Sequence, residues 1–309
     1  MKTIYLHIGI GKTGTTKLQE HLSKCHETLK SNGVHYVLKG GGLQGHGHQA
    51  FAKSCISDIP SYMELTGNIQ DQRRAVLDEI ANEQADTFLL SSENFAVANP
   101  ADVLSAFDTI TDELAFKIIL FVRSQDELIE SEDNQLIKVR KETMTLEEYR
   151  ETFFEGDFMA LATRWGAAFG EENLICRIYD AKKMDVITDF FSCLPIEASN
   201  LAIADTTEPT RAKVNQSLGA MAFFSKLAEN DDQSIPDNFD LGKSLPAILM
   251  DSQMARKIRS DFAQSNFSFT EKYIGQATEE IGGRRYTDAE RDQFYASCEK
   301  LKQSISQKQ

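Results

Sequence analysis

Gly9-Ile10-Gly11-Lys12-Thr13-Gly14-Thr15-Thr16 is the stretch of this 309-residue chain that decides its fold. Residues Thr3 to Ile8 before it are rich in β-formers, and an apolar stripe from Leu18 to Leu29 after it has helical spacing. The stretch is therefore predicted to join a strand to a helix N-terminus. Such an N-terminus offers unpaired N–H groups and the positive end of the helix dipole. Together with the charge of Lys12, it predicts a phosphate-binding loop.

A nucleotide-binding Walker A loop is the first interpretation to test. That motif has a glycine five positions before its Gly-Lys pair, and this chain has Leu6 at that position, so the spacing does not match. A P-loop kinase with a degenerate loop stays open as an alternative. It needs a magnesium-binding carboxylate at a strand end, for which Ser91-Ser92-Glu93 is a poor match. A non-catalytic nucleotide-binding protein also stays open.

A second anion-binding feature is predicted further along the chain. The apolar run from Phe116 to Val122 is typical of a buried strand, it ends in Arg123, and Ser131 follows eight positions later. A guanidinium group binds a phosphate through two parallel hydrogen bonds, and a hydroxyl group can complete the shell of the phosphate oxygens. Arg123 and Ser131 are therefore candidates for a second phosphate site.

Both features resemble the sulfotransferase family. Lys12-Thr13-Gly14-Thr15-Thr16 matches the family's 5′-phosphosulfate loop, Lys-x-Gly-Thr-Thr or Lys-x-Gly-Thr-Ser. Arg123 with Ser131 is similar to the family's Arg-x7-Ser clamp for a 3′-phosphate. The chain departs from the pattern at Gly11, where the family often has proline, and at Ser124, where proline usually follows the arginine. The resemblance is strongest over residues 1–140 and is to bacterial, carbohydrate-type members.

The resemblance implies the cofactor 3′-phosphoadenosine-5′-phosphosulfate (PAPS) and no metal. The first loop is expected to hold its 5′-phosphate, and the clamp its 3′-phosphate. In several members a late basic loop closes over the 3′-phosphate and the adenine, which implies the same for Arg284 and Arg285. The implied cofactor-binding residues are Gly11, Lys12, Thr13, Gly14, Thr15, Thr16, Arg123, Ser131, Arg284 and Arg285.

The catalytic base has more than one candidate. Glu93 follows the apolar strand before the arginine strand, where the resembled family brings a histidine or, in carbohydrate enzymes, often a glutamate. This position implies that Glu93 takes the proton of an acceptor hydroxyl, while Lys12 neutralises the leaving group. His46 and His48 lie in a glycine-rich loop, and such loops often touch substrate. Either histidine could be the base instead, or bind the acceptor.

Alternation of strands and helices over residues 1–205 predicts an α/β fold of three layers, with a central parallel sheet of about five strands. Residues 206–309 are predicted to be a helical extension that packs on this core, so that residues 1–309 form a single domain. A capping box at Thr145 to Glu148 predicts one long helix that runs to Trp165, whose side chain is expected in the core. The predicted strands are Thr3–Gly9, Val34–Val37, Asp86–Ser91, Phe116–Val122 and Asn173–Tyr179.

Composition limits the partners. The net charge of −14 argues against generic binding to nucleic acid or to anionic membranes. No apolar stretch approaches the ~20 residues that span a bilayer, the N-terminus does not resemble a signal peptide, and five scattered cysteines indicate a reducing compartment. A cytoplasmic location is therefore expected. The expected partner is a hydroxyl-bearing acceptor, preferably a carbohydrate or glycolipid.

Overall fold

The computed structural model describes most of the chain, which divides into two compact units. The first unit comprises Met1–Arg123, Asp157–Ala204 and Ser265–Ile281, and the second comprises Ser124–Gly156, Asp205–Gln264 and Gly282–Gln309. Within them the described residues are 1–41, 45–59, 68–110, 113–140 (backbone alone from 134), 146–152, 154–180, 185–196, 250–282, 287–289, 291–293 and 295–296.

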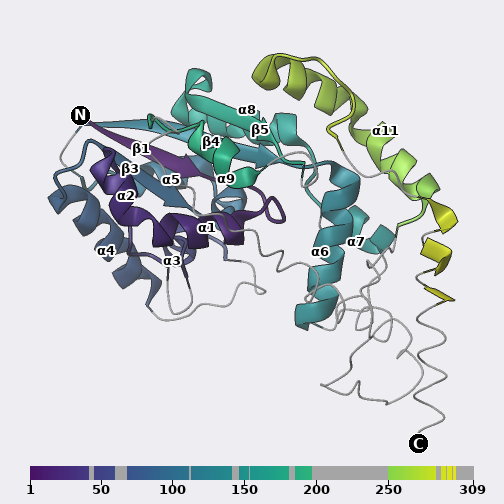
Figure 1. Ribbon diagram of the computed structural model, residues 1–309, viewed down its shortest axis with the longest axis horizontal. Coiled ribbons are helices and arrows are strands. Elements are labelled where there is room, and N and C mark those ends of the chain that lie inside the picture. The colour runs from purple at the N-terminus through teal and green to yellow at the C-terminus, as the bar shows by residue number, and fades with distance from the viewer. Residues whose placement is uncertain are drawn as a thin grey trace, which may run out of the picture. The chain divides into compact units, whose positions relative to one another are not determined.

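A five-stranded parallel sheet is the centre of the first unit (Figure 1). After β1 (Lys2–His7) the chain moves to β2 (Val34–Tyr36) at one edge of the sheet. After β3 (Thr87–Ser91) it moves to β4 (Leu114–Val122) on the other side of β1, and then to the next strand outward. β1 therefore lies at a topological switch point, where open parallel sheets bind ligands beyond the carboxyl ends of their strands. The predicted parallel sheet of about five strands is confirmed. In the order β2-β3-β1-β4-β5, the strands are β2 (Val34–Tyr36), β3 (Thr87–Ser91), β1 (Lys2–His7), β4 (Leu114–Val122) and β5 (Leu174–Ile178).

One face of the sheet is covered by three helices from two parts of the chain. These are α1 (Thr15–Lys24), α2 (His26–Ser31) and α9 (Val186–Phe191). Their apolar side chains form one buried cluster with alternate residues of the strands, such as Leu89 and Ile119. Period-two alternation therefore decides which strand residues meet these helices.

The opposite face is covered by α4 (Ile69–Asn82), α5 (Pro100–Ser105) and α8 (Phe158–Phe169). Phe116 of β4 meets Phe169 of α8 edge-on, with ring centroids 5.2 Å apart. Figure 1 shows α1 and α8 on opposite sides of the sheet, which gives the three layers that the sequence predicts. The first unit also contains α3 (Gln49–Ser54), the 3-10 turns η2 (Glu93–Val97) and η3 (Glu171–Asn173), and the π-helical turn η6 (Thr270–Ile274).

The second unit is helical where it is described. It contains α6 (Gln125–Arg140), α7 (Leu146–Thr152) and the first part of α11 (Ser252–Phe269). Asp126 of α6 is fully buried and accepts a hydrogen bond of 2.7 Å from Nε of Arg259 on α11. Because a buried carboxylate without a partner is strongly destabilising, this ion pair fixes α6 against α11.

The prediction of one long helix from Thr145 to Trp165 is wrong. The chain forms α7 and then, after a break, the separate helix α8. The break comes at Asp157, whose side chain accepts a hydrogen bond from Ala160 N at 2.9 Å and so caps the new helix. Trp165 is fully buried, as expected. None of the described helices is long and apolar enough to cross a membrane.

Candidate active site

The loop after β1 has the backbone of an anion cradle. Lys12 has φ 64° and Gly14 has φ 82°, so two residues of this short turn have left-handed conformations. Gly14 is the N-cap of α1, and no side chain caps the first turn of that helix. The N–H groups at this N-terminus are therefore not satisfied by a cap and point along the dipole toward the loop. This geometry suits an anion bound against residues 14–16.

The three threonines of the loop have different environments. Thr13 is buried, and its hydroxyl donates a hydrogen bond of 2.7 Å to the carbonyl of Ile10, which closes the turn. Thr15 is buried as well, whereas Thr16 is exposed. Lys12 and Gly11 are half-buried. The Thr13 side chain thus holds the loop together, and the backbone groups of the loop are what it offers to an anion.

Arg123 joins the end of β4 to this loop. Its Nη1 donates a hydrogen bond of 3.0 Å to the carbonyl oxygen of Lys12. Its guanidinium carbon lies 5.8 Å from the ring centroid of Tyr179, directly after β5. A Cβ on Gly14 would lie 3.4 Å from the ring of Tyr179, so the loop packs closely against the same side chain. Arg123 therefore adds a fixed positive charge beside the loop.

Glu93 lies at the same edge of the sheet. The strand register pairs His7 of β1 with Ser91 of β3, so the two strands end side by side. The loop of residues 9–16 follows His7, and Glu93 follows Ser91. Glu93 is half-buried and begins the turn η2, whose cap is Ser92. Its Oε2 accepts a hydrogen bond of 3.2 Å from Nε2 of Gln19 in α1. The carboxylate is thus held at the edge where the parallel strands end.

The environment of His48 corrects the sequence-based assignment of this residue to catalysis or substrate binding. The ring is 1% exposed. Its Nδ1 accepts a hydrogen bond of 3.0 Å from Ser91 N, so Nε2 carries the proton and donates it to Val37 O at 2.7 Å. Burial lowers the pKa of His48 to about 4. His48 therefore fastens its loop to β2 and β3, and we do not propose it as the base.

The other two histidines near this edge differ from each other. His46 is exposed, and its backbone carbonyl accepts a hydrogen bond from the hydroxyl of Tyr36. His7 is buried between Phe121 and Phe190, and burial lowers its pKa to about 3. Only His46 keeps its ring accessible to a ligand among these three.

Three predicted cofactor residues, Ser131, Arg284 and Arg285, stay predictions. Ser131 lies in α6 and belongs to the second unit. Arg284 and Arg285 lie outside the described residues. Two residues that the sequence did not single out do contact the site, namely Gln19 and Tyr179. Gln19 directly follows Leu18 of the apolar stripe, but a polar residue at the flank of such a stripe is usually exposed, so the signal was weak.

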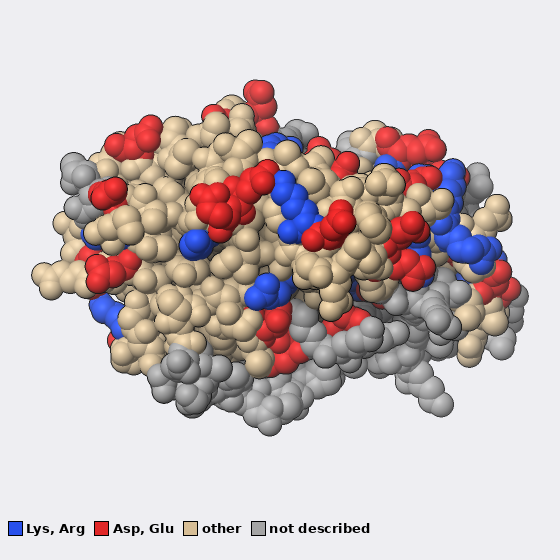
Figure 2. Space-filling view, turned by 90° about the horizontal axis from the view of Figure 1, so that it is seen from above, with Lys and Arg blue, Asp and Glu red and all other residues tan. Residues whose placement is uncertain are grey.

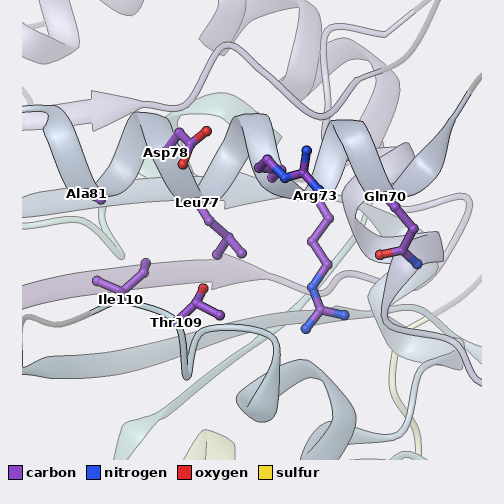
Figure 3. A pocket seen from close by; sticks show the side chains of 8 residues that line it. Gln70, Arg73, Leu77, Asp78, Ala81, Thr109 and Ile110 are labelled. Carbon is purple, nitrogen blue, oxygen red and sulfur yellow. The ribbon is translucent and has the colours of Figure 1, made fainter.

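A separate hollow of about 420 Å³ lies away from this edge (Figure 3). Figure 3 shows that α4 forms one side of it, with Leu77 and Arg73 pointing toward the segment that carries Thr109 and Ile110. That segment precedes β4, at the amino end of the strands, and no predicted site residue lines the hollow. In the described part of the chain, no group of three or more His, Cys, Asp or Glu residues is placed to hold a metal ion.

On the side that Figure 2 presents, the charges of the described residues do not gather into one basic face. Figure 2 shows Lys and Arg side chains interspersed with Asp and Glu over the described residues of the side that it presents. With a net charge of −14, such a surface does not favour the phosphate backbone of a nucleic acid. The positive groups of the loop are therefore a local feature.

No family model matches the chain. An uncharacterized protein of Archaeoglobus fulgidus is 32% identical over 112 residues, which cover 35% of this chain and 30% of that relative. A sulfotransferase structure from Alicyclobacillus acidocaldarius has a TM-score of 0.43 at 15% identity, covering 76% of this chain and 98% of that one. A mouse sulfotransferase structure complexed with PAP has a TM-score of 0.38 at 14% identity, covering 89% and 85%. These scores are low, so the functional argument rests on the site itself.

Proposed function

We propose that this protein is a sulfotransferase that moves a sulfuryl group from PAPS to a hydroxyl group, preferably of a carbohydrate or glycolipid. The observation that carries the proposal is the loop after β1. Its helix N-terminus has no side-chain cap, and Arg123 is hydrogen-bonded to the loop backbone at 3.0 Å. Lys12 belongs to the same loop and is half-buried. An uncapped helix end with two cations suits a ligand that carries more than one phosphate-like group.

The donor set fits a nucleotide with phosphates at two positions. The N–H groups of residues 14–16 and the ammonium group of Lys12 would hold the 5′-phosphate. Arg123, stacked over Tyr179, would take the 3′-phosphate, because guanidinium binds phosphate in a bidentate manner. Ser131, Arg284 and Arg285 remain predicted partners of the 3′-phosphate. PAPS, when bound, supplies the activated sulfuryl group.

The residues of the chain then have separate tasks in an in-line displacement. Glu93 accepts the proton of the acceptor hydroxyl as the bond from that oxygen to sulfur forms. The bond between sulfur and the bridging oxygen breaks at the same time, and Lys12 balances the negative charge that develops on this oxygen. Exposed His46 remains a proposed contact of the acceptor.

Transfer of label tests the proposal. The protein is incubated with ³⁵S-labelled PAPS and a mixture of p-nitrophenyl glycosides without magnesium, and in parallel with γ-³²P-labelled ATP and magnesium. The proposal expects a sulfated glycoside from the first mixture and no phosphorylated product from the second. Magnesium-dependent phosphorylation with no sulfated product would overturn it in favour of a kinase.

A further inference from the structure

Gln19 is a buried polar residue whose side chain contacts the end of β3, the turn η2 and the helix α3. Its side chain belongs to α1 and is only 4% exposed. Its Nε2 lies 3.2 Å from Glu93 Oε2, 3.3 Å from Ser91 Oγ and 3.4 Å from Ser91 O. The hydroxyl of Ser91 in turn contacts Nδ1 of buried His7 at 2.8 Å. A row of polar contacts therefore runs from His7 through Ser91 and the amide of Gln19 to Glu93.

The orientation of this amide follows from its partners. The carboxylate of Glu93 and the carbonyl of Ser91 accept hydrogen bonds, so the side facing them must be the NH₂ group, which has two protons to donate. The opposite side, Oε1, accepts a hydrogen bond of 2.9 Å from Nε2 of Gln49. The contacts on both sides of the amide thus agree on one orientation.

The loop before α3 closes over Gln19 and keeps it in place. A Cβ on Gly47 would lie 2.5 Å from Cδ of Gln19, so any larger residue would displace the Gln19 amide from its present position. Gly47 is followed by His48, which is bonded to the backbone of both β2 and β3. The Gln19 side chain is therefore confined by α1 on one side and by an anchored loop on the other.

We propose that Gln19 is the positioning residue for Glu93: its amide fixes Oε2 of the carboxylate and leaves Oε1 to receive the proton of the acceptor. This inference rests on the proposed function, in which Glu93 is the base. A neutral amide suits the task, because it orients a carboxylate by donation without adding a charge that would compete for the proton. The helix that presents the phosphate-binding amides thus also carries the group that orients the base.

Turnover is the first test of this role. Replacing Gln19 by Leu keeps the volume but removes the donor, and misplacement of the base is expected to lower kcat about 10- to 100-fold. KM for PAPS and calorimetric affinity for adenosine 3′,5′-bisphosphate are expected to stay the same. In a Glu93→Gln background, Gln19→Leu is expected to cause no further loss, since it acts through Glu93. An equal loss in both backgrounds would overturn the inference. Gln84→Leu, at an exposed glutamine before β3, is the control.

Thermal stability tests the contact without any substrate. Gln19→Glu places two carboxylates against each other and is expected to lower the melting temperature at pH 8. Adding Glu93→Gln restores a carboxylate–amide pair with its members exchanged, so the double variant is expected to recover most of that loss while turnover stays low. A double variant as unstable as Gln19→Glu alone would overturn the inference. If the melting temperature recovers but the wild-type protein transfers no label from PAPS, the contact stands and the proposed function fails.

Discussion

Two glycine-containing segments lie at the carboxyl edge of the sheet, and they use their polar groups in opposite ways. Residues 9–16 keep an uncapped helix N-terminus and place Lys12 and Gly14 at positive φ. Residues 45–49 turn His48 inward, where backbone groups bind both ring nitrogens. Glycine serves a left-handed turn in the first segment and close approach to Gln19 in the second. Similar composition can therefore build either an uncapped helix N-terminus or a loop that is anchored through a buried ring.

Glu93→Gln gives the largest effect that this comparison predicts. If the edge of β3 supplies the base, removal of its proton-accepting charge should lower kcat about 10²- to 10⁴-fold. Binding of adenosine 3′,5′-bisphosphate should be retained, because Glu93 is not assigned to the cofactor. Steady-state kinetics with labelled PAPS and calorimetry measure the two quantities. Wild-type kcat in this variant would remove Glu93 from the mechanism and reopen the choice of base.

Lys12→Ala is expected to lower kcat about 100-fold, the scale of losing one preorganised electrostatic donor. Lys12→Gly makes a useful companion, since Lys12 has φ 64° and glycine has no Cβ to strain at that angle. The glycine variant should lose as much turnover as the alanine variant. Its free energy of unfolding should be about 1 kcal/mol higher than that of the alanine variant. Urea denaturation gives the stabilities. Equal stability of the two variants would argue against a left-handed backbone at this position.

The strand, turn and helix N-terminus around residues 9–16 could be predicted from sequence because they depend on local backbone geometry. A strand, a glycine turn and a helix N-terminus follow one another in the chain, so the eight adjacent residues 9–16 are enough to specify this geometry. The same holds for the parallel sheet, since each buried strand reads as an apolar run. The break between α7 and α8 was missed because the cap on Asp157 competes with continuation of an otherwise helical pattern.

The roles of His48 and Gln19 could not be predicted in this way. Whether a histidine faces a ligand or the core depends on partners far away in sequence, here Val37 and Ser91. Gln19 owes its position to Glu93 and Gln49, which the chain reaches only through tertiary folding. The contacts of such side chains depend on the packing of several elements, so a motif within one segment does not predict them.

Arg123→Gln should weaken binding of adenosine 3′,5′-bisphosphate about 10-fold or more, because charge-assisted hydrogen bonds are roughly twice as strong as neutral ones. A matched control is Arg164→Gln, since exposed Arg164 also donates to a backbone carbonyl, that of Ala96, at 3.2 Å. The control should bind the bisphosphate as the wild type does. Calorimetry compares the three proteins, and equal weakening by both substitutions would assign the effect to general charge instead of to the loop.

Replacement of His48 is expected to have a smaller effect, which appears in the pH dependence of the free energy of unfolding. Burial lowers its pKa to about 4 in the folded chain, below its ordinary value of 6.5, so the unfolded state binds more protons between these values. Stability is therefore fully present above pH 6.5 and falls as the pH drops toward 4, by up to about 1.4 kcal/mol per pH unit. His48→Gln should flatten this slope and keep the turnover of the folded protein. Urea denaturation from pH 4 to 7 measures it; an unchanged slope would contradict the buried, neutral ring.

Calorimetric titration with adenosine 3′,5′-bisphosphate and with ADP, both without magnesium, decides whether this protein recognises a nucleotide by its 3′-phosphate. Only the bisphosphate carries the 3′-phosphate that Arg123 is proposed to recognise, whereas both ligands offer a 5′-phosphate to the loop of residues 9–16. The account predicts tight binding of the bisphosphate and weak binding of ADP. Equal affinities, or a preference for ADP once magnesium is added, would contradict it and identify the loop as part of a nucleoside-phosphate site of the kinase type.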